Sequence, residues 1–160
     1  MAHATRHTHM TTIGEICNRE VIVAPPDTTV SAGAKLMRHH HVGSIVIVDT
    51  TATGPRRPIG LVTDRDIVVE VTAMDLDPNV LTLGDIMVRE LITAREHDGV
   101  LETMEVMRYR GVRRIPVVTG TQQLVGIVTI DDLLEVLSEE LAALTKIVAR
   151  EQVREAAART

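Results

Sequence analysis

The apolar residues of the chain follow two patterns, and each pattern predicts a different kind of element. Runs of almost uninterrupted Val, Ile and Leu predict short strands that are covered on both faces. These runs are 21–24, 44–48, 59–62, 91–94, 115–118 and 124–128. Apolar residues at helical spacing predict amphipathic helices at about 29–40 and 99–109. Strands and helices in this order predict an α/β fold of the α+β type.

The ends of the helices also carry signals. One face of each amphipathic helix is apolar: Val30, Ala34 and Met37 in the first, and Val100, Met104 and Met107 in the second. Asp98 is expected to cap the start of the second helix. The stretches 12–15 and 82–85 have the Thr-x-x-acid pattern of a capping box, which predicts two further short helices.

The second half of the sequence repeats the first. Segment 13–16 (IGEI) corresponds to 83–86 (LGDI), and 42–48 (VGSIVIV) corresponds to 112–118 (VRRIPVV). The block 59–66 (IGLVTDRD) meets 125–132 (VGIVTIDD), after a loop that is shorter in the second copy. Each copy has the order β-α-β-β-α. A unit of about 60 residues buries little core alone, so the two copies are expected to pack together.

These blocks resemble the tandem cystathionine-β-synthase (CBS) domain pair, or Bateman module, here as a small stand-alone protein. The resemblance covers about 11–137. It implies repeats at 11–72 and 82–137 joined by a linker at 73–81. The polar segment at 1–10 is expected to be a flexible tail, and 138–160 is expected to be a C-terminal helix. The resemblance also implies pseudo-two-fold symmetry, homodimerisation and a regulatory role. Two clefts between the repeats would bind adenosine derivatives such as AMP, ADP, ATP, NAD or S-adenosylmethionine.

The resemblance assigns roles to the two closing Thr-x-x-Asp blocks. Asp66 and Asp132 would accept hydrogen bonds from the ribose hydroxyls, and Thr63 and Thr129 would lie near phosphate. The chemistry is suitable, because a helix N-terminus offers free N–H groups and a carboxylate accepts from both hydroxyls of a diol. The same pattern is also that of an ordinary capping box, which competes for the Asp side chain. Both interpretations stay open at this stage.

Arginines are the candidate phosphate ligands. Arg113 and Arg114 begin a strand of the second copy, where the first copy has Gly43 and Ser44, so the two sites are not equivalent. Arg65 is a third candidate, and the alternative for each arginine is a surface ion pair. The base would lie against aliphatic residues that are equally suited to the core. These are Ile22, Val42, Ile45, Ile92, Val112, Ile115 and Pro116.

Composition narrows the classes of function. The net charge is −5, and the chain has one Tyr and no Phe or Trp. A nucleic-acid partner is therefore not expected, because such binding needs positive charge for the phosphates or aromatic rings for the bases. The single cysteine, Cys17, excludes a disulfide framework, and 39–41 (HHH) points its side chains apart on a helix, so no metal is expected. The sequence contains no arrangement of a nucleophile and a base that would support catalysis, so the protein is not expected to be an enzyme. Without an apolar run of membrane length or a signal peptide, the expected location is cytoplasmic.

The stretch 131–159 lacks Pro and Gly and predicts one long helix. Its apolar residues have 3–4 spacing until glutamates interrupt them: Leu134, Leu137, Leu141, Leu144 and Val148. This stripe outruns the repeat and favours a dimer contact. The sequence therefore predicts a homodimeric regulatory module that binds an adenine nucleotide or dinucleotide, without naming the ligand or the regulated protein. The alternative is a ligand-free interaction scaffold that acts through the C-terminal helix.

Overall fold

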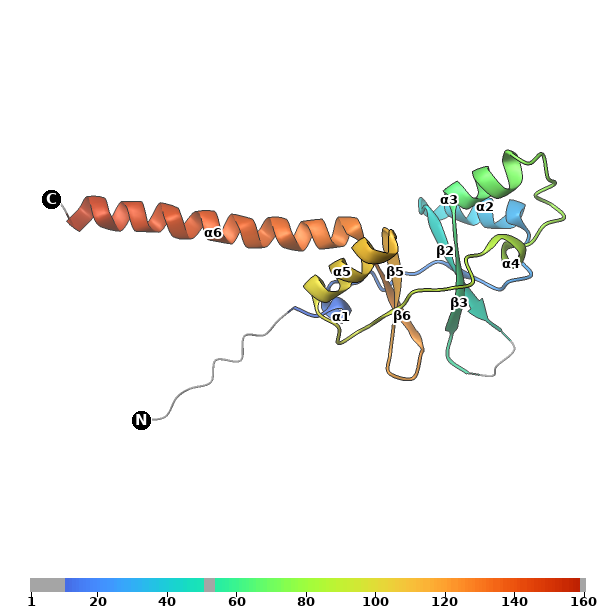
Figure 1. Ribbon diagram of the computed structural model, residues 1–160, viewed down its shortest axis with the longest axis horizontal. Helices are drawn as coiled ribbons and strands as arrows, with labels where there is room; N and C mark the ends of the chain where they lie inside the picture. Colours follow the sequence, from blue (N-terminus) through green and yellow to red (C-terminus); the bar gives the residue numbers. More distant parts are fainter. Residues whose placement is uncertain (1–10, 51–53, 159–160) are drawn as a thin grey trace.

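The computed structural model describes residues 11–50 and 54–158. Its first half contains α1 (Ile13–Ile16), β1 (Val23–Ala24), α2 (Val30–His40), β2 (Ser44–Asp49), β3 (Arg57–Thr63), α3 (Asp64–Asp66) and a π-helix, η1 (Ile67–Thr72). Its second half contains α4 (Leu83–Ile86), β4 (Ala94–Arg95), α5 (Val100–Arg110), β5 (Arg114–Val118), β6 (Leu124–Thr129) and α6 (Ile130–Ala158). The predicted α/β class and the repeated element order are confirmed (Figure 1).

The strands form two separate three-stranded sheets with the same topology. β1 is parallel to β2 and β2 is antiparallel to β3, and β4, β5 and β6 repeat this arrangement. Each sheet has an irregularity at the same place, between Ile47 and Val48 in one and between Val117 and Val118 in the other. The first strand of each sheet is shorter than predicted, because only two residues pair with the neighbouring strand.

Helices α2 and α5 lie where the sequence predicted them, but their details differ. The Thr29 hydroxyl accepts a hydrogen bond from the Ala32 N–H and caps α2. The predicted cap of α5 was wrong: Gly99 holds that position, and Asp98 instead accepts from the Arg95 N–H at 2.7 Å in the preceding turn.

The predicted apolar faces of the two helices are confirmed at Val30, Met37, Val100 and Met107, which are all buried, and they differ at single positions. Gly33 and Thr103 are buried, while Ala34 and Met104 are half-buried. The cause in α2 is close packing, because a Cβ atom on Gly33 would lie 2.7 Å from Leu83 Cδ2.

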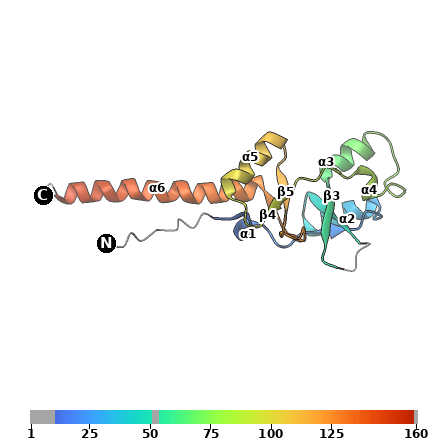
Figure 2. The same cartoon turned by 60° about the horizontal axis from the view of Figure 1, so that its bottom comes forward.

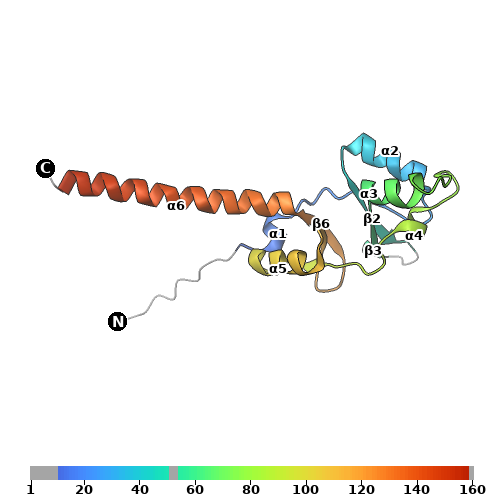
Figure 3. The ribbon, with the colours of Figure 1, turned by 45° about the horizontal axis from the view of Figure 1, so that its top comes forward.

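The opening helices are exchanged between the repeats. Ile13 of α1 is buried in a core with Ile115 and Val128 of the second repeat. Leu83 of α4 is buried with Ile45 of the first repeat. Figures 1 and 3 accordingly place α1 beside α5, and α4 beside β3. Each repeat therefore completes its core with a helix from the other.

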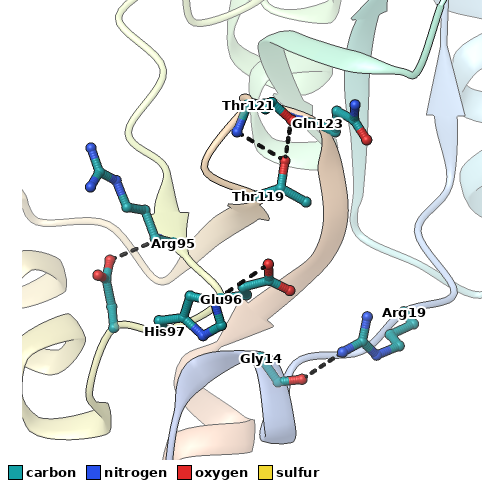
Figure 4. A network of polar contacts seen from close by, with 9 residues as sticks. Gly14, Arg19, Arg95, Glu96, His97, Thr119, Thr121 and Gln123 are labelled. Carbon is teal, nitrogen blue, oxygen red and sulfur yellow. Dashed lines mark hydrogen bonds and ion pairs between the residues drawn. The ribbon is translucent and has the colours of Figure 1, made fainter.

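Backbone hydrogen bonds hold the exchanged helices. The Gly14 N–H donates to the Glu96 carbonyl at 2.8 Å, and the Gly84 N–H donates to the Pro26 carbonyl at 2.8 Å. Both glycines are required by close approach, since a Cβ atom would meet these carbonyl oxygens at 2.7 and 2.9 Å. The Arg19 guanidinium, in turn, donates to the Gly14 carbonyl (Figure 4). Because 14 and 84 are corresponding positions, the contacts obey the pseudo-two-fold symmetry.

The helices that close the two repeats differ most. After Thr63 the chain forms α3, of three residues, and then the six-residue π-helix η1. After Thr129 it forms α6, of 29 residues, so the predicted long helix is confirmed. The last 20 residues of α6, about 30 Å of helix, project away from both sheets (Figures 1 and 2). Across the described ranges, no helix combines the length and apolar character needed to span a bilayer.

Candidate functional site

Two clefts open between the repeats. The first, here called the α6 cleft, has a volume of about 360 Å³. It is lined by Asn18, Glu20, Val21, Ile22, Val42, Gly43, Ser44, Val46, Arg113, Arg114, Ile127, Thr129, Ile130, Asp131 and Asp132. The second, the α3 cleft, has a volume of about 420 Å³. It is lined by Leu61, Thr63, Asp64, Arg65, Asp66, Val88, Glu90, Leu91, Ile92, Gly111, Val112, Arg113, Arg114 and Pro116. Both volumes are in the usual range for small-molecule sites.

Each cleft combines the Thr-x-x-Asp block of one repeat with strand-edge residues of the other. Thr129 and Asp132 of the second repeat face Ile22 of the first across the α6 cleft. In the α3 cleft, Asp66 of the first repeat faces Ile92 of the second. Neither site exists in one repeat alone.

The Thr and Asp side chains form genuine capping boxes. Asp66 Oδ2 accepts from the Thr63 N–H and from the Thr63 hydroxyl, both at 2.7 Å. Asp132 Oδ2 does the same with Thr129, at 2.7 and 2.8 Å. Among the described residues, Oδ1 of either aspartate has no hydrogen-bond partner. The cap therefore fixes each carboxylate through Oδ2 and leaves Oδ1 available for a further hydrogen bond, so the two interpretations of the motif are compatible.

The basic side chains lie at the wall between the clefts. Arg113 and Arg114 line both clefts, and Arg65 lines the α3 cleft only. Arg114 extends from β5 across to the first repeat, since a Cβ atom on Gly43 would lie 3.4 Å from its Nη1 atom. Cationic groups of this kind suit a phosphate or carboxylate.

A sequence model of the CBS domain matches residues 13–73 and 83–139. The chain belongs to the CBS-domain family. Two relatives show the degree of sequence similarity. An uncharacterized protein of Methanopyrus kandleri is 38% identical over 124 residues, 78% of this chain and 61% of that protein. Hypoxic response protein 1 of Mycobacterium tuberculosis is 35% identical over 130 residues, 81% of this chain and 87% of its own length.

Solved CBS structures share the fold. A CBS domain protein from Pyrobaculum aerophilum complexed with AMP has a TM-score of 0.69 at 28% identity, over 76% of this chain and 88% of that one. The CBS domain pair of MJ0100, in complex with 5′-methylthioadenosine and S-adenosyl-L-methionine, has a TM-score of 0.69 at 26% identity, over 82% and 98% of the two chains. A crystal structure of hypoxic response protein 1 holds two coordinated zinc ions.

Most of the site residues predicted from the sequence line the two CBS clefts. Ile45 and Ile115 do not: both are fully buried in the cores. Successive strand residues face opposite ways, so Ser44 and Val46 line the α6 cleft while Ile45 faces inward. These two isoleucines are therefore withdrawn from the ligand contacts.

Acidic residues of the clefts were missed by the sequence analysis. Glu20 and Glu90 hold corresponding positions in the two clefts, and Asp64 lies where the other cleft has Ile130. The repeat itself could have found the glutamates, since they stand 70 positions apart directly before the aligned strands.

Other reactive side chains lie away from the clefts. Cys17 is buried, and burial raises the pKa of its thiol, so the thiolate is disfavoured. His41 ends α2 in the left-handed conformation, and the rings of His39 and His40 pack edge to face. In the part of the chain that the structure describes, no three His, Cys, Asp or Glu side chains are grouped to hold a metal ion.

Proposed function

We propose that this CBS pair is a regulatory module that binds an adenine nucleotide in the clefts between its repeats. The observation that carries the proposal is the repeated construction of the clefts. In each, a capped aspartate from one repeat lines the same cleft as aliphatic residues of the other. The AMP and S-adenosylmethionine complexes of related CBS pairs support the same ligand class.

Different lining residues would bind the ribose, the base and the phosphate of the nucleotide. Asp66 and Asp132 accept hydrogen bonds from the ribose hydroxyls through Oδ1, because Oδ2 already serves the cap. Ile22 and Val42 in one cleft, and Ile92 and Val112 in the other, offer flat aliphatic surface to the base. The guanidinium groups neutralise phosphate. AMP, ADP, ATP and NAD-type dinucleotides all present these three parts.

A calorimetric titration of AMP into nucleotide-free protein tests this assignment. The double variant Asp66→Asn, Asp132→Asn removes both carboxylate charges at nearly constant size. We expect its affinity for AMP to fall about 10- to 100-fold, because hydrogen bonds to a charged acceptor are lost.

The matched control is Asp85→Asn. Asp85 accepts from the Thr82 N–H and hydroxyl in the same way, but it is exposed on α4 and lies outside both clefts. AMP affinity should be unchanged in this variant. If the double variant also binds AMP like the parent chain, the site assignment is wrong.

The ligand itself can be identified by thermal unfolding against AMP, ADP, ATP, NAD, NADH and S-adenosylmethionine. Binding to the folded state at one hundred times the dissociation constant adds about 2.7 kcal/mol of stability. A protein without bound nucleotide, checked by its absorbance at 260 nm, that responds to none of these ligands would contradict the proposal.

A second candidate function rests on α6. Its projecting part leaves apolar side chains uncovered, with Leu141 63% and Leu144 58% exposed. We propose that a second copy of the chain covers this stripe, so that the module works as a homodimer and α6 serves as an interaction scaffold. Truncation after Ser138 should leave the two sheets folded and turn the dimer into a monomer in sedimentation equilibrium. A truncated chain that stays dimeric would contradict this role for α6.

A further inference from the structure

The two clefts share one pair of arginines. Of all described residues, Arg113 and Arg114 alone line both clefts. The corresponding residues of the first repeat are Gly43 and Ser44, which carry no charge. A module with exact symmetry would have an arginine pair for each cleft, whereas this chain has one pair between them.

The remaining charges of the clefts are mostly negative. The α6 cleft contributes Glu20, Asp131 and Asp132 and no basic residue of its own. The α3 cleft contributes Asp64, Asp66 and Glu90. It also has Arg65, at the position where the α6 cleft has Asp131. Without the shared pair, the α6 cleft would therefore repel a phosphate.

The geometry of the dividing wall leaves the arginines free to serve a ligand. A Cβ atom on Gly43 would lie 3.2 Å from Asp64 Oδ2 and 3.4 Å from Arg114 Nη1, so both side chains lie next to Gly43. The Asp64 N–H donates to the Gly43 carbonyl and fixes the wall. Within the described ranges, neither Arg113 nor Arg114 forms an ion pair or a side-chain hydrogen bond. Their charges are not committed to either cleft.

We propose that the two clefts compete for this arginine pair, so that one chain binds one phosphate-bearing nucleotide tightly. The inference rests on the proposed nucleotide-binding function and adds a rule of occupancy to it. The phosphate belongs in the α3 cleft, where Arg65 adds a third cation. Once the pair is engaged there, the α6 cleft keeps its ribose-binding aspartate and aliphatic wall but has no cation. It then takes an adenosine derivative without phosphate in preference to a second nucleotide.

Calorimetric titrations with AMP and with adenosine test the rule. We expect AMP to bind one site tightly and a second at least tenfold more weakly, since charge-assisted hydrogen bonds are missing there. Adenosine should bind both clefts with similar affinities. A chain saturated with AMP at its tight site should still bind one adenosine.

Two variants test whether the shared arginine pair, and not another difference between the clefts, causes the unequal AMP affinities. Ser44→Arg places an arginine in the α6 cleft at the position that corresponds to Arg114, and it should bring the two AMP affinities together. The double variant Arg113→Gly, Arg114→Ser introduces the corresponding residues of the first repeat. It should weaken AMP binding at the tight site about 10- to 100-fold and change the affinity for adenosine little. Arg110→Ser, an exposed change on α5 outside both clefts, is the control and should alter neither ligand. Circular dichroism verifies the fold of each variant.

The outcomes distinguish this inference from the proposed function. Two equal and independent AMP sites in the parent chain would overturn the shared-pair rule and leave the nucleotide-binding function standing. So would an arginine double variant whose AMP affinities match those of the parent. If AMP and adenosine fail to bind while another nucleotide binds, this inference alone is overturned. If every nucleotide tested fails to bind, the proposed function is refuted and this inference with it.

Discussion

Replacing Leu83 with Ala tests the exchange of the opening helices directly. Leu83 belongs to the second repeat in sequence, but its side chain is fully buried in the core of the first. It packs closely on Gly33 of α2. Shortening the side chain therefore leaves a cavity, and the neighbouring backbone has little freedom to move in and fill it. Buried Leu→Ala changes cost about 3–5 kcal/mol, and we expect a loss of unfolding free energy in that range.

Urea unfolding followed by circular dichroism measures the loss, and hydrogen exchange locates it. The amides of β2 and β3, far away in sequence, should lose protection before those of β5 and β6. Leu101→Ala is the control, because that side chain is 61% exposed and its loss should cost less than about 0.5 kcal/mol. A cost below about 1 kcal/mol for Leu83→Ala, or a loss of protection confined to β5 and β6, would refute the exchange.

Two further predictions concern the same helices. Gly84→Ala should lower the free energy of unfolding in urea by about 1–3 kcal/mol, because the new Cβ atom would meet the Pro26 carbonyl oxygen at 2.9 Å. Gly99→Ala is the control and should cost less, since open space surrounds that position. Equal costs for the two variants would contradict the close approach at Gly84. Hydrogen bonds from Thr82 lower the pKa of Asp85 below 3.8, so its stabilising effect is present above that pH and is lost as pH falls through the lowered value. Asp85→Asn should therefore reduce the acid sensitivity of the unfolding free energy, and an unchanged pH profile would exclude this role.

The sequence pattern was sufficient to predict where the helices and strands lie, but not which core the opening helices pack against. Apolar runs and helical spacing located β2, β3, β5, β6, α2 and α5, because these signals are local. The capping boxes at Thr12 and Thr82 marked where α1 and α4 begin. Nothing local states which core receives each helix, so the exchange was not predicted. The π-helical winding of η1 likewise has no counterpart in α6, although both follow aligned Thr-x-x-Asp blocks.

The candidate site was predictable in its motifs and less so in its walls. The resemblance to the CBS pair located both clefts, because the Thr-x-x-acid pattern by itself also marks the ordinary capping boxes at Thr12 and Thr82. Ile45 and Ile115 were assigned wrongly because every residue of a buried strand is apolar, and composition does not reveal which face a side chain takes. The sharing of Arg113 and Arg114 depends on how the two repeats meet, which is a tertiary property.

The exchange of the opening helices also decides how the module would carry a mechanical load. α1 is anchored in the core of the second repeat, and α6 grows from that same repeat, so both ends of the described chain leave from one half of the body (Figure 1). A pulling force applied between these ends passes through the contacts of Ile13 and bypasses the first repeat until α1 detaches. A load applied at either of these ends would therefore reach the body through the second repeat, and the first repeat would form the distal, unloaded tip.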